Sequence, residues 1–428
     1  MSNAETQRGL NRTYSFSRSH ELFSRASGVI PGGIYGHFSP SRVVPASCYP
    51  FFAVSGKGSH FVDADGNDFI DFMCAYGPMI LGYNNEVVDE AARRQAAKGD
   101  TLMGPAPIMV ELAEYLVELI PFAAWALFAK NGADMTTHAT MIARAATGRP
   151  KIVAIKGGYL GMAAWMQGEG QYGVTREDAL NTIRIPWNDA AAFERVLDEH
   201  PAQIAGFISS PYHHPSFEDS ALPAEGYWRR IRELCDKHGV VLIIDDVRCG
   251  FRLDLRGSHE YFGFTPDLAC YSKAIANGYA LSAMVGSEEL RSAASEVRNT
   301  GSYWYQAVPM AAALATLGEL DRLDAPKRLA AYGSRLAEGL SDVAAAYDCH
   351  LKVTGPPQIP YLRLTDDDSM MLHQRFCAEC TRRGAYFVAG RNWQVSCAHT
   401  EADLARTLEI ADEAFQALQE EGVLEAAK

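Results

Sequence analysis

An acidic residue and a lysine stand at positions where a catalytic pair is expected. Asp245 directly follows the apolar run Val240–Ile244, and Lys273 comes 28 residues later in the segment Tyr-Ser-Lys-Ala. A carboxylate directly after a buried strand is poorly explained by packing, because burial removes its hydration. In mostly parallel sheets, ligands bind at the carboxyl ends of the strands. There, a lysine amine can form an imine with a carbonyl compound, and a carboxylate can face a cationic ring nitrogen.

These two groups suit the chemistry of pyridoxal phosphate. That cofactor needs a lysine to hold it as an imine and an acid to keep its ring nitrogen protonated, so that the ring can accept electrons. The spacing alone leaves an alternative open, in which Asp245 caps a turn and Lys273 is a solvated surface amine.

The elements that must position this pair alternate between short apolar runs and helical segments from about residue 76 to 320. This alternation predicts a sheet covered by helices. The runs Lys151–Ile155, Ile204–Ile208 and Val240–Ile244 are rich in Ile and Val, which predicts strands buried on both faces. Residues 227–238 predict a helix with one apolar stripe that ends at Gly239, a residue suited to the left-handed cap.

The two ends of the chain have a different pattern. The first fifty residues are polar and rich in proline, which predicts an extended arm. Residues 54–72 predict two short strands around the turn 63–66, because Asp and Gly tolerate the positive φ of tight hairpins. After residue 320, the sequence predicts helices at 325–347 and 400–421 with short strands at 361–364 and 394–396. We therefore expect an arm with a small antiparallel unit (1–75), a large domain (76–320) and a small α+β domain (321–428).

Composition narrows the classes of function. The 428 residues are 48% hydrophobic and 21% charged, which is typical of a globular protein. A formal net charge of -13 argues against nucleic acid as a partner. The longest apolar stretch, 120–129, is too short for a membrane-spanning helix, and the N-terminus lacks an apolar signal core, so we expect no membrane partner and a cytoplasmic location.

The nine cysteines indicate reduced thiols rather than a disulfide framework. Only Cys377 and Cys380 form a close pair, and neither a second such pair nor a histidine doublet accompanies them. Two thiols on one helix face explain that pair more simply than a zinc site does. We therefore assign no metal.

Beyond these residues, the chain resembles the fold-type-I, class III aminotransferases over nearly its whole length, and within that family the glutamate-1-semialdehyde aminomutases. The resemblance implies an α/β fold with a mostly parallel sheet covered by helices and a smaller α+β domain formed by the C-terminal part and the N-terminal segment. It also implies pyridoxal 5'-phosphate as cofactor and a homodimer. It is carried by the segments Ile30–Gly33, Asp63–Gly66, Tyr76–Gly82, Thr147–Arg149, Asp245–Val247, Gly250–Arg252, Thr265–Leu268 and by Lys273.

Particular residues take roles by this resemblance. Lys273 is implied to form the Schiff base with the cofactor, Asp245 to pair with the ring nitrogen, and Tyr159 to stack on the ring. The loop formed by Asn131, Gly132 and Ala133 precedes a predicted helix and is implied to bind the phosphate with its backbone N–H groups. Ser302 is implied to reach the phosphate of the neighbouring subunit.

Several departures from the family pattern concern the substrate and one cofactor contact. Leu160 replaces a histidine after the stacking tyrosine. The segment after strand 204–208 lacks the Asn or Gln that would contact the cofactor's phenolic oxygen, and Tyr212, His213 or Ser216 are candidates to replace it. The arginine with which the aminomutase grips its substrate near the N-terminus is absent, whereas Arg391 offers a fork for a carboxylate.

Those losses favour intermolecular transamination over the aminomutase reaction. The sequence therefore predicts transfer of an amino group between an amine or β-amino acid and a keto acid or aldehyde. An aromatic pocket for a bulky or weakly charged substrate is expected, although each side chain could equally be ordinary packing. The expected pocket residues are Tyr35, Tyr76, Tyr303, Trp304 and Trp393.

Rival functions remain open at this point. An aminomutase or racemase would use the same lysine and acid, and a decarboxylase would be similar in parts. A binding or regulatory protein that has kept the fold is the alternative outside enzymes, and the intact pair of Asp245 and Lys273 disfavours it.

Overall fold

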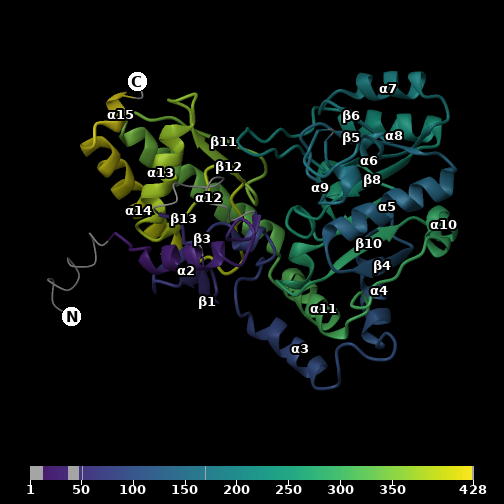
Figure 1. The fold of residues 1–428 in the computed structure, drawn as a ribbon, viewed down its shortest axis with the longest axis horizontal. Coiled ribbons are helices and arrows are strands. Elements are labelled where there is room, and N and C mark those ends of the chain that lie inside the picture. Colours follow the sequence, from purple (N-terminus) through teal and green to yellow (C-terminus); the bar gives the residue numbers. More distant parts are fainter. Residues whose placement is uncertain (1–12, 37–47, 51, 169, 427–428) are drawn as a thin grey trace.

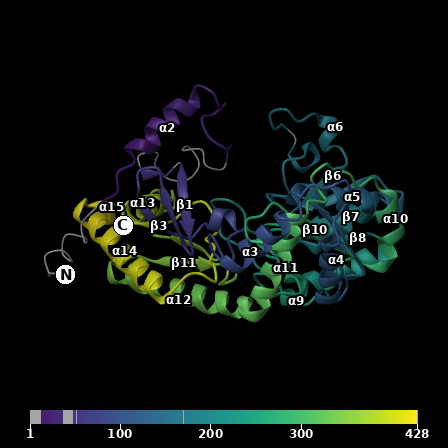
Figure 2. The ribbon, with the colours of Figure 1, turned by 90° about the horizontal axis from the view of Figure 1, so that it is seen from below.

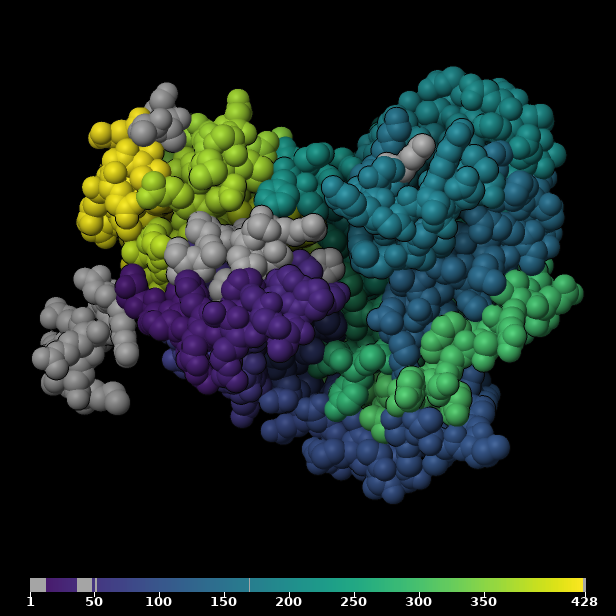
Figure 3. All heavy atoms as spheres, in the orientation of Figure 1, coloured from purple at the N-terminus to yellow at the C-terminus, as the bar shows by residue number. Residues whose placement is uncertain are grey.

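The computed structural model describes residues 13–36, 48–50, 52–168 and 170–426. The chain forms two lobes, a large one built around a central sheet and a smaller one that contains the C-terminal helices (Figure 1). The space-filling view shows a notch between the lobes (Figure 3). The boundaries predicted at residues 75 and 320 remain predictions.

A seven-stranded sheet forms the centre of the large lobe. Its order is β4-β10-β9-β8-β7-β5-β6. Strands β6, β5, β7, β8 and β9 run parallel to one another, whereas β10 is antiparallel to both β9 and β4. The strands are β4 (Trp125–Ala129), β5 (Lys151–Ile155), β6 (Thr182–Ile185), β7 (Ile204–Ser209), β8 (Val241–Asp245), β9 (Leu268–Tyr271) and β10 (Ser282–Gly286). A mostly parallel sheet is therefore confirmed, and the three predicted strands are β5, β7 and β8.

Helices cover both faces of this sheet. On one face α5 (Gly132–Thr147) and α10 (Arg291–Glu296) share a buried cluster with the strands, and on the other α7 (Ala190–Glu199) and α8 (Tyr227–His238) do so. The remaining helices of this lobe are α3 (Glu86–Ala96), α4 (Ile108–Leu119), α6 (Arg176–Ala179), α9 (Ser258–Phe262) and α11 (Ala307–Arg322), with short turns η4 (Ala164–Met166) and η6 (Glu288–Leu290). Within the described residues, no helix is long and apolar enough to cross a membrane.

The helix α8 matches its predicted bounds. Its buried residues include Trp228, Ile231, Leu234 and Cys235, which form the predicted stripe. Gly239 ends it with φ of 61°, a left-handed conformation that glycine adopts without a steric penalty. The chain then enters β8, which ends at Asp245.

The smaller lobe combines segments from both ends of the chain. Strands β1 (Ala53–Lys57), β2 (His60–Asp63) and β3 (Asp68–Asp71) form a sheet with β13 (Ala385–Tyr386), and β11 (Leu351–Thr354) pairs with β12 (Tyr361–Leu364). The helices of this lobe are α12 (Ala325–Ala346), α13 (Met371–Thr381), α14 (Glu401–Glu420) and α15 (Val423–Ala426). The expectation that N-terminal and C-terminal segments build one α+β unit is confirmed.

Two strand predictions need correction. Residues 54–72 hold three strands rather than two, and the predicted turn 63–66 joins only β2 to β3. Residues 394–396 form no strand, because their neighbourhood makes backbone hydrogen bonds to three separate segments rather than to one ladder. Gln394 N–H donates to the Phe72 carbonyl at 2.6 Å, and Cys397 N–H to the Ile80 carbonyl at 2.7 Å.

The predicted extended arm contains a helix, α2 (Ser17–Ser27). Its N-terminus is capped from outside the segment, since the Asp65 carboxylate accepts from the N–H groups of Arg18 at 2.6 Å and Ser19 at 2.8 Å. Figure 2 shows α2 and α6 on the same side of the molecule, over different lobes. The parts of the arm at 1–12 and 37–47 lie outside the described residues.

Candidate functional site

Asp245 is a buried carboxylate at the carboxyl end of the central strand β8. Only 6% of the residue is exposed, and its Oδ1 accepts the Val247 N–H at 3.1 Å. Burial raises its pKa to about 7, while the charge of Lys273 acts in the opposite direction. A carboxylate with so little hydration is stabilised as an anion by any cation brought beside it.

Lys273 lies just beyond the end of β9, the parallel neighbour of β8, so the two side chains come from adjacent strand ends. Its φ is 47°, a left-handed conformation that costs a non-glycine residue roughly 1–2 kcal/mol. Burial lowers its pKa to about 7, as does the charge of Arg248, and Asp245 opposes both. The pair therefore meets in one electrostatic environment, as the sequence predicted.

A left-handed turn closes the other side of Lys273. Cys74, Ala75, Tyr76 and Gly77 all have positive φ, and an added Cβ on Gly77 would lie 3.6 Å from Cδ of Lys273. Neighbours fix this turn at both ends. The Asp71 carboxylate accepts from Met73 N–H at 2.7 Å, and the buried Arg252 donates to the Gly77 carbonyl at 2.6 Å. The backbone of this turn is thereby held close to the Lys273 side chain at Gly77.

The predicted phosphate loop lies at the start of α5. The first N–H groups of a helix have no partner inside it, which leaves those of Gly132 and Ala133 for an anion. This end of the helix touches the turn after β8, because an added Cβ on Gly132 would lie 2.7 Å from a methyl group of Val247. The predicted phosphate loop therefore contacts Val247, which follows Asp245 by two residues.

Tyr159 and two other tyrosines border the same space. Tyr159 is half exposed, and burial and the nearby Tyr35 hydroxyl raise its pKa, as does Asp245. The charges of Arg248 and Arg391 act on it in the opposite direction. Burial also raises the pKa of Tyr76 to about 12, and Arg391 and Tyr35 act on that hydroxyl too. The Tyr159 hydroxyl is therefore within electrostatic range of Asp245, and Arg391 and Tyr35 act on both Tyr159 and Tyr76.

Loops of the two lobes interlock above the strand ends. The Arg391 guanidinium donates to the Ser216 hydroxyl, and the Phe217 N–H donates to the Gly390 carbonyl at 3.1 Å. Asn392 donates to the Ser220 hydroxyl at 2.9 Å. The site is thus formed at the junction between the lobes, with residues from both.

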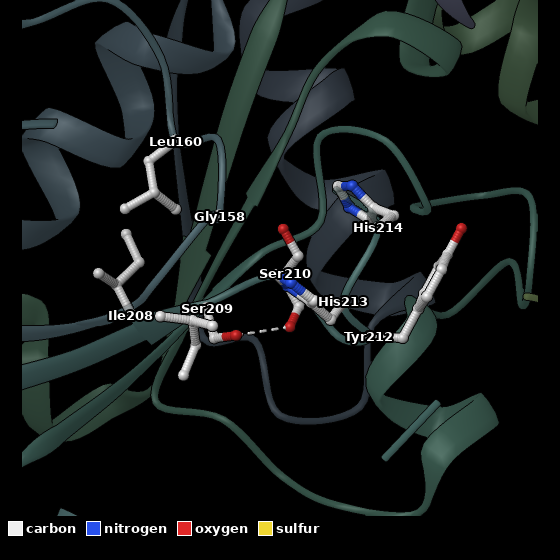
Figure 4. Close-up of a pocket in the computed structure, with 9 residues that line it drawn as sticks. Gly158, Leu160, Ile208, Ser209, Ser210, Tyr212, His213 and His214 are labelled. Carbon is white, nitrogen blue, oxygen red and sulfur yellow. Dashed lines mark hydrogen bonds between the residues drawn. The ribbon is translucent and has the colours of Figure 1, made fainter. Parts of the chain in front are cut away.

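A small pocket opens at the carboxyl ends of β5 and β7. It is lined by Ile155, Gly158, Leu160, Ile208, Ser209, Ser210, Tyr212, His213 and His214. Figure 4 shows Leu160 and Ile208 on one side and His213 beside Ser210 on the other, while Tyr212 points away. Burial and the charge of Arg248 hold the pKa of His214 well below its usual range, so this imidazole is neutral.

Trp393 lies in the core, whereas the predicted roles of Tyr303 and Trp304 stay predictions. Trp393 is 1% exposed and stacks on Phe387 with ring centroids 3.8 Å apart, so it belongs to the core and does not line a pocket. Trp304 packs edge-on against His138 of α5, and Ser302 and Tyr303 are exposed on the loop before α11. The predicted substrate role of Trp393 is therefore wrong, because its ring is needed for packing.

The close cysteine pair lies inside α13. Cys377 Sγ is 3.6 Å from His373 Nε2, and Cys380 is buried nearby on the same helix. In the part of the chain that the structure describes, no group of three or more His, Cys, Asp or Glu side chains could hold a metal ion.

Sequence reasoning missed Arg248, Asn392 and Asp71. Arg248 directly follows the Asp245-Asp246-Val247 motif, and this position was the only available signal. Asn392 and Asp71 act through contacts with distant segments, which no local pattern reveals.

Known proteins share this sequence and fold. The family model described as Aminotransferase class-III matches residues 43–418. An aminopentol aminotransferase of Sphingopyxis macrogoltabida is 40% identical over 94% of each chain, and a glutamate-1-semialdehyde 2,1-aminomutase of Desulforamulus reducens is 31% identical over 95% of this chain and 99% of that one. The solved FumI protein of Sphingopyxis sp. MTA144, in its pyridoxal-phosphate internal aldimine form, superposes with a TM-score of 0.92 at 40% identity, covering 95% of this chain and 97% of that one.

Proposed function

This chain belongs to the class III aminotransferases, enzymes that move an amino group with pyridoxal phosphate, and from that premise we propose that Lys273 and Asp245 carry its reaction. The observation that supports the proposal best is their position at adjacent ends of parallel strands, with the pKa of each brought to about 7. An isolated surface lysine or a turn-capping acid would not have such a neighbour.

Pyridoxal phosphate, when bound, supplies an electrophilic carbon that links to amines and a ring that accepts electrons. Lys273 would hold that carbon through its Nζ. Once released, the Nζ would accept the proton from the carbon that bears the substrate nitrogen and would give it back on the cofactor side. With its pKa lowered to about 7, roughly half of the amine would be able to accept a proton at neutral pH.

Asp245 holds the proton on the ring nitrogen. Burial makes the Asp245 anion unfavourable unless a cation lies beside it. A protonated ring nitrogen would be such a cation, so the carboxylate would be stabilised as an anion and the nitrogen would keep its proton. Gly132 and Ala133 bind the phosphate through the N–H groups at the start of α5. Asn131 precedes them, with its own N–H held by the Asp134 carboxylate at 2.8 Å. Tyr159 covers the ring.

We propose a homodimer in which the loop of Ser302 reaches the phosphate bound by a second copy. Ser302 is exposed in this chain, and Trp304 next to it packs against α5. Analytical ultracentrifugation should give twice the chain mass, and Ser302→Ala should weaken cofactor binding. A monomer that retains full affinity for the cofactor would contradict the dimer.

The proposed donor is a bulky, weakly charged amine, and the proposed acceptor is a keto acid. Tyr35 and Tyr76 supply the aromatic surface, and Arg391, which is anchored by Ser216, binds the acceptor carboxylate. The aminopentol aminotransferase, at 40% identity, is a relative named for such an amine. The absence of the arginine with which aminomutases grip their substrate supports transfer between two molecules.

A screen of amines against pyruvate and 2-oxoglutarate tests this proposal. We expect turnover of long aliphatic or aromatic amines with at least one of the two acceptors, and transfer of labelled nitrogen from donor to acceptor. Isomerisation of a single substrate with retention of its nitrogen would instead establish an aminomutase and overturn the transferase.

We also propose a cytoplasmic location. All nine cysteines are buried and none forms a disulfide among the described residues, which suits a reducing compartment. Cell fractionation of the native host with an antibody against the chain would test it, and recovery from an oxidising compartment would contradict it.

A further inference from the structure

Arg248 is a cation in the site for which the proposed chemistry has no role. It lies three residues beyond Asp245 and is partly buried. Its Nη1 donates to Asn392 Oδ1 at 3.0 Å, and Asn392 is itself 2% exposed and anchored by Ser220. Arg248 forms no ion pair with any described carboxylate. The guanidinium thus has a neutral anchor on one nitrogen, and its other N–H groups can serve an anion.

Arg248 lies three residues after Asp245, in the turn that follows the end of β8, and its charge acts on both members of the proposed pair. Of all ionised groups, Arg248 acts most strongly on Lys273, and it also acts on Asp245 and His214. The residue before it, Val247, contacts the start of α5. The turn after β8 therefore directs Val247 toward the phosphate loop, whereas Arg248 reaches the small lobe at Asn392.

The covalent structure of the cofactor determines which of its atoms lies on the side of the site where Arg248 is found. In pyridoxal phosphate, the carbon that links to lysine stands opposite the ring nitrogen, with the phosphate arm on one flank and the phenolic oxygen on the other. With Lys273, Asp245 and the start of α5 in their proposed places, the phenolic oxygen faces away from α5. We infer that Arg248 donates a charge-assisted hydrogen bond to this oxygen, an inference that rests on the proposed function.

The three residues considered from sequence for this contact are engaged elsewhere. Tyr212 is fully buried in an apolar cluster and points away from the pocket (Figure 4). His213 stacks on Trp187 with ring centroids 6.0 Å apart, and the Ser216 hydroxyl accepts from Arg391. Of the two cations that act on Lys273, Arg248 is the one that is not bound to two backbone carbonyls.

A cation at this oxygen has a consequence that a neutral amide would lack. It stabilises the phenolate and disfavours a proton on the Lys273 nitrogen nearby, so that nitrogen should lose its proton at a lower pH. Asp245 raises the pKa of Lys273 and Arg252 lowers it, and the variants described below leave both groups in place. Cys249 has its pKa raised well above its usual range and is a neutral thiol, and the imidazole of His214 is neutral. Arg252 is bound to two backbone carbonyls.

The test is a pH titration of the visible absorbance of the holoenzyme without substrate. In Arg248→Met, the midpoint should rise by about one pH unit or more, which is the effect of removing a unit charge several ångströms away at an effective dielectric constant of about 20. Arg248→Lys, which keeps the charge, should shift it less. Arg230→Gln is the matched control: it removes an arginine that is paired with Glu194 at the surface and is not among the main influences on Lys273, and it should leave the midpoint unchanged.

Two results separate this inference from the proposed function. An unchanged midpoint in Arg248→Met, together with a raised KM for the keto acid, would make Arg248 a substrate-carboxylate residue and overturn the inference alone. If the Met variant loses the cofactor, the same titration is made on Arg248→Gln, which keeps an N–H donor without the charge. An unchanged midpoint in that variant would also overturn the inference. A wild-type protein without the visible band would instead overturn the proposed roles of Lys273 and Asp245.

Discussion

Replacing Gly132 by alanine should weaken cofactor binding through a steric effect on the phosphate loop. The new Cβ would lie 2.7 and 2.8 Å from the two methyl carbons of Val247, and ordinary contacts begin near 3.4 Å. The start of α5 and the turn after Asp245 must therefore separate by about 0.7 Å, the difference between 3.4 and 2.7 Å. Overpacking of this kind typically costs about 1–3 kcal/mol.

Because the displaced N–H groups are those proposed to bind phosphate, part of this energy should appear as lost affinity for pyridoxal phosphate. A loss of about 1.4 kcal/mol corresponds to a tenfold rise in the dissociation constant. Fluorescence titration of the apoenzyme with the cofactor would measure it. We expect a rise of about tenfold or more, with a lower melting temperature of the holoenzyme.

Two controls isolate the cause. Gly318→Ala lies inside the helix α11 with open space at the added Cβ, so it should be neutral or stabilise the protein by roughly 0.5–1 kcal/mol. Adding Val247→Ala to Gly132→Ala removes the methyl groups that clash and should recover most of the affinity. Unchanged cofactor affinity in Gly132→Ala alone would refute the placement of the phosphate loop.

Three further outcomes follow from the same structure. Lys273→Ala should abolish transamination, and borohydride treatment of the wild type should fix the cofactor on the Lys273 peptide; turnover by the variant would contradict its role. Asp245→Asn should lower kcat by at least about a hundredfold. A buried charged hydrogen bond contributes about 1.5–3 kcal/mol, and a ring nitrogen that loses its proton withdraws electrons less strongly from the reacting carbon. An unaltered kcat would contradict the contact between Asp245 and the ring nitrogen. The bond from His60 to Asp403 raises the pKa of His60, so it stabilises the fold fully below the unfolded pKa of about 6.5 and fades as pH rises through the folded value. His60→Gln should therefore lower the melting temperature at about pH 5.5 more than at about pH 9, with a loss of roughly 0.5–1 kcal/mol because the side chain is partly exposed; an equal loss at both pH values would contradict this.

Much of the large lobe could be predicted from local sequence because its signals are local. Lys151–Ile155 is a continuous Ile- and Val-rich run, and the strand has those bounds. Gly239 marks the end of α8 because the left-handed cap needs a residue without a Cβ. The proposed pair, Asp245 and Lys273, followed from the type of residue at two strand ends.

The remainder depends on contacts between distant residues. The helix α2 has no local cap, and its N–H groups are satisfied by Asp65, 46 and 47 residues further along the chain. Arg248 meets Asn392 across 144 residues, so no spacing rule could reveal a cation beside Lys273. Trp393 resembled a pocket residue by type alone, but stacking on Phe387 places it in the core.

A crystal structure of the holoenzyme would show the contacts of both Lys273 and Asp245 with the cofactor. We expect continuous density from Lys273 Nζ to the cofactor and an Asp245 carboxylate oxygen within about 3.2 Å of the ring nitrogen. A cofactor attached to another lysine, or a ring nitrogen that faces away from Asp245, would contradict it.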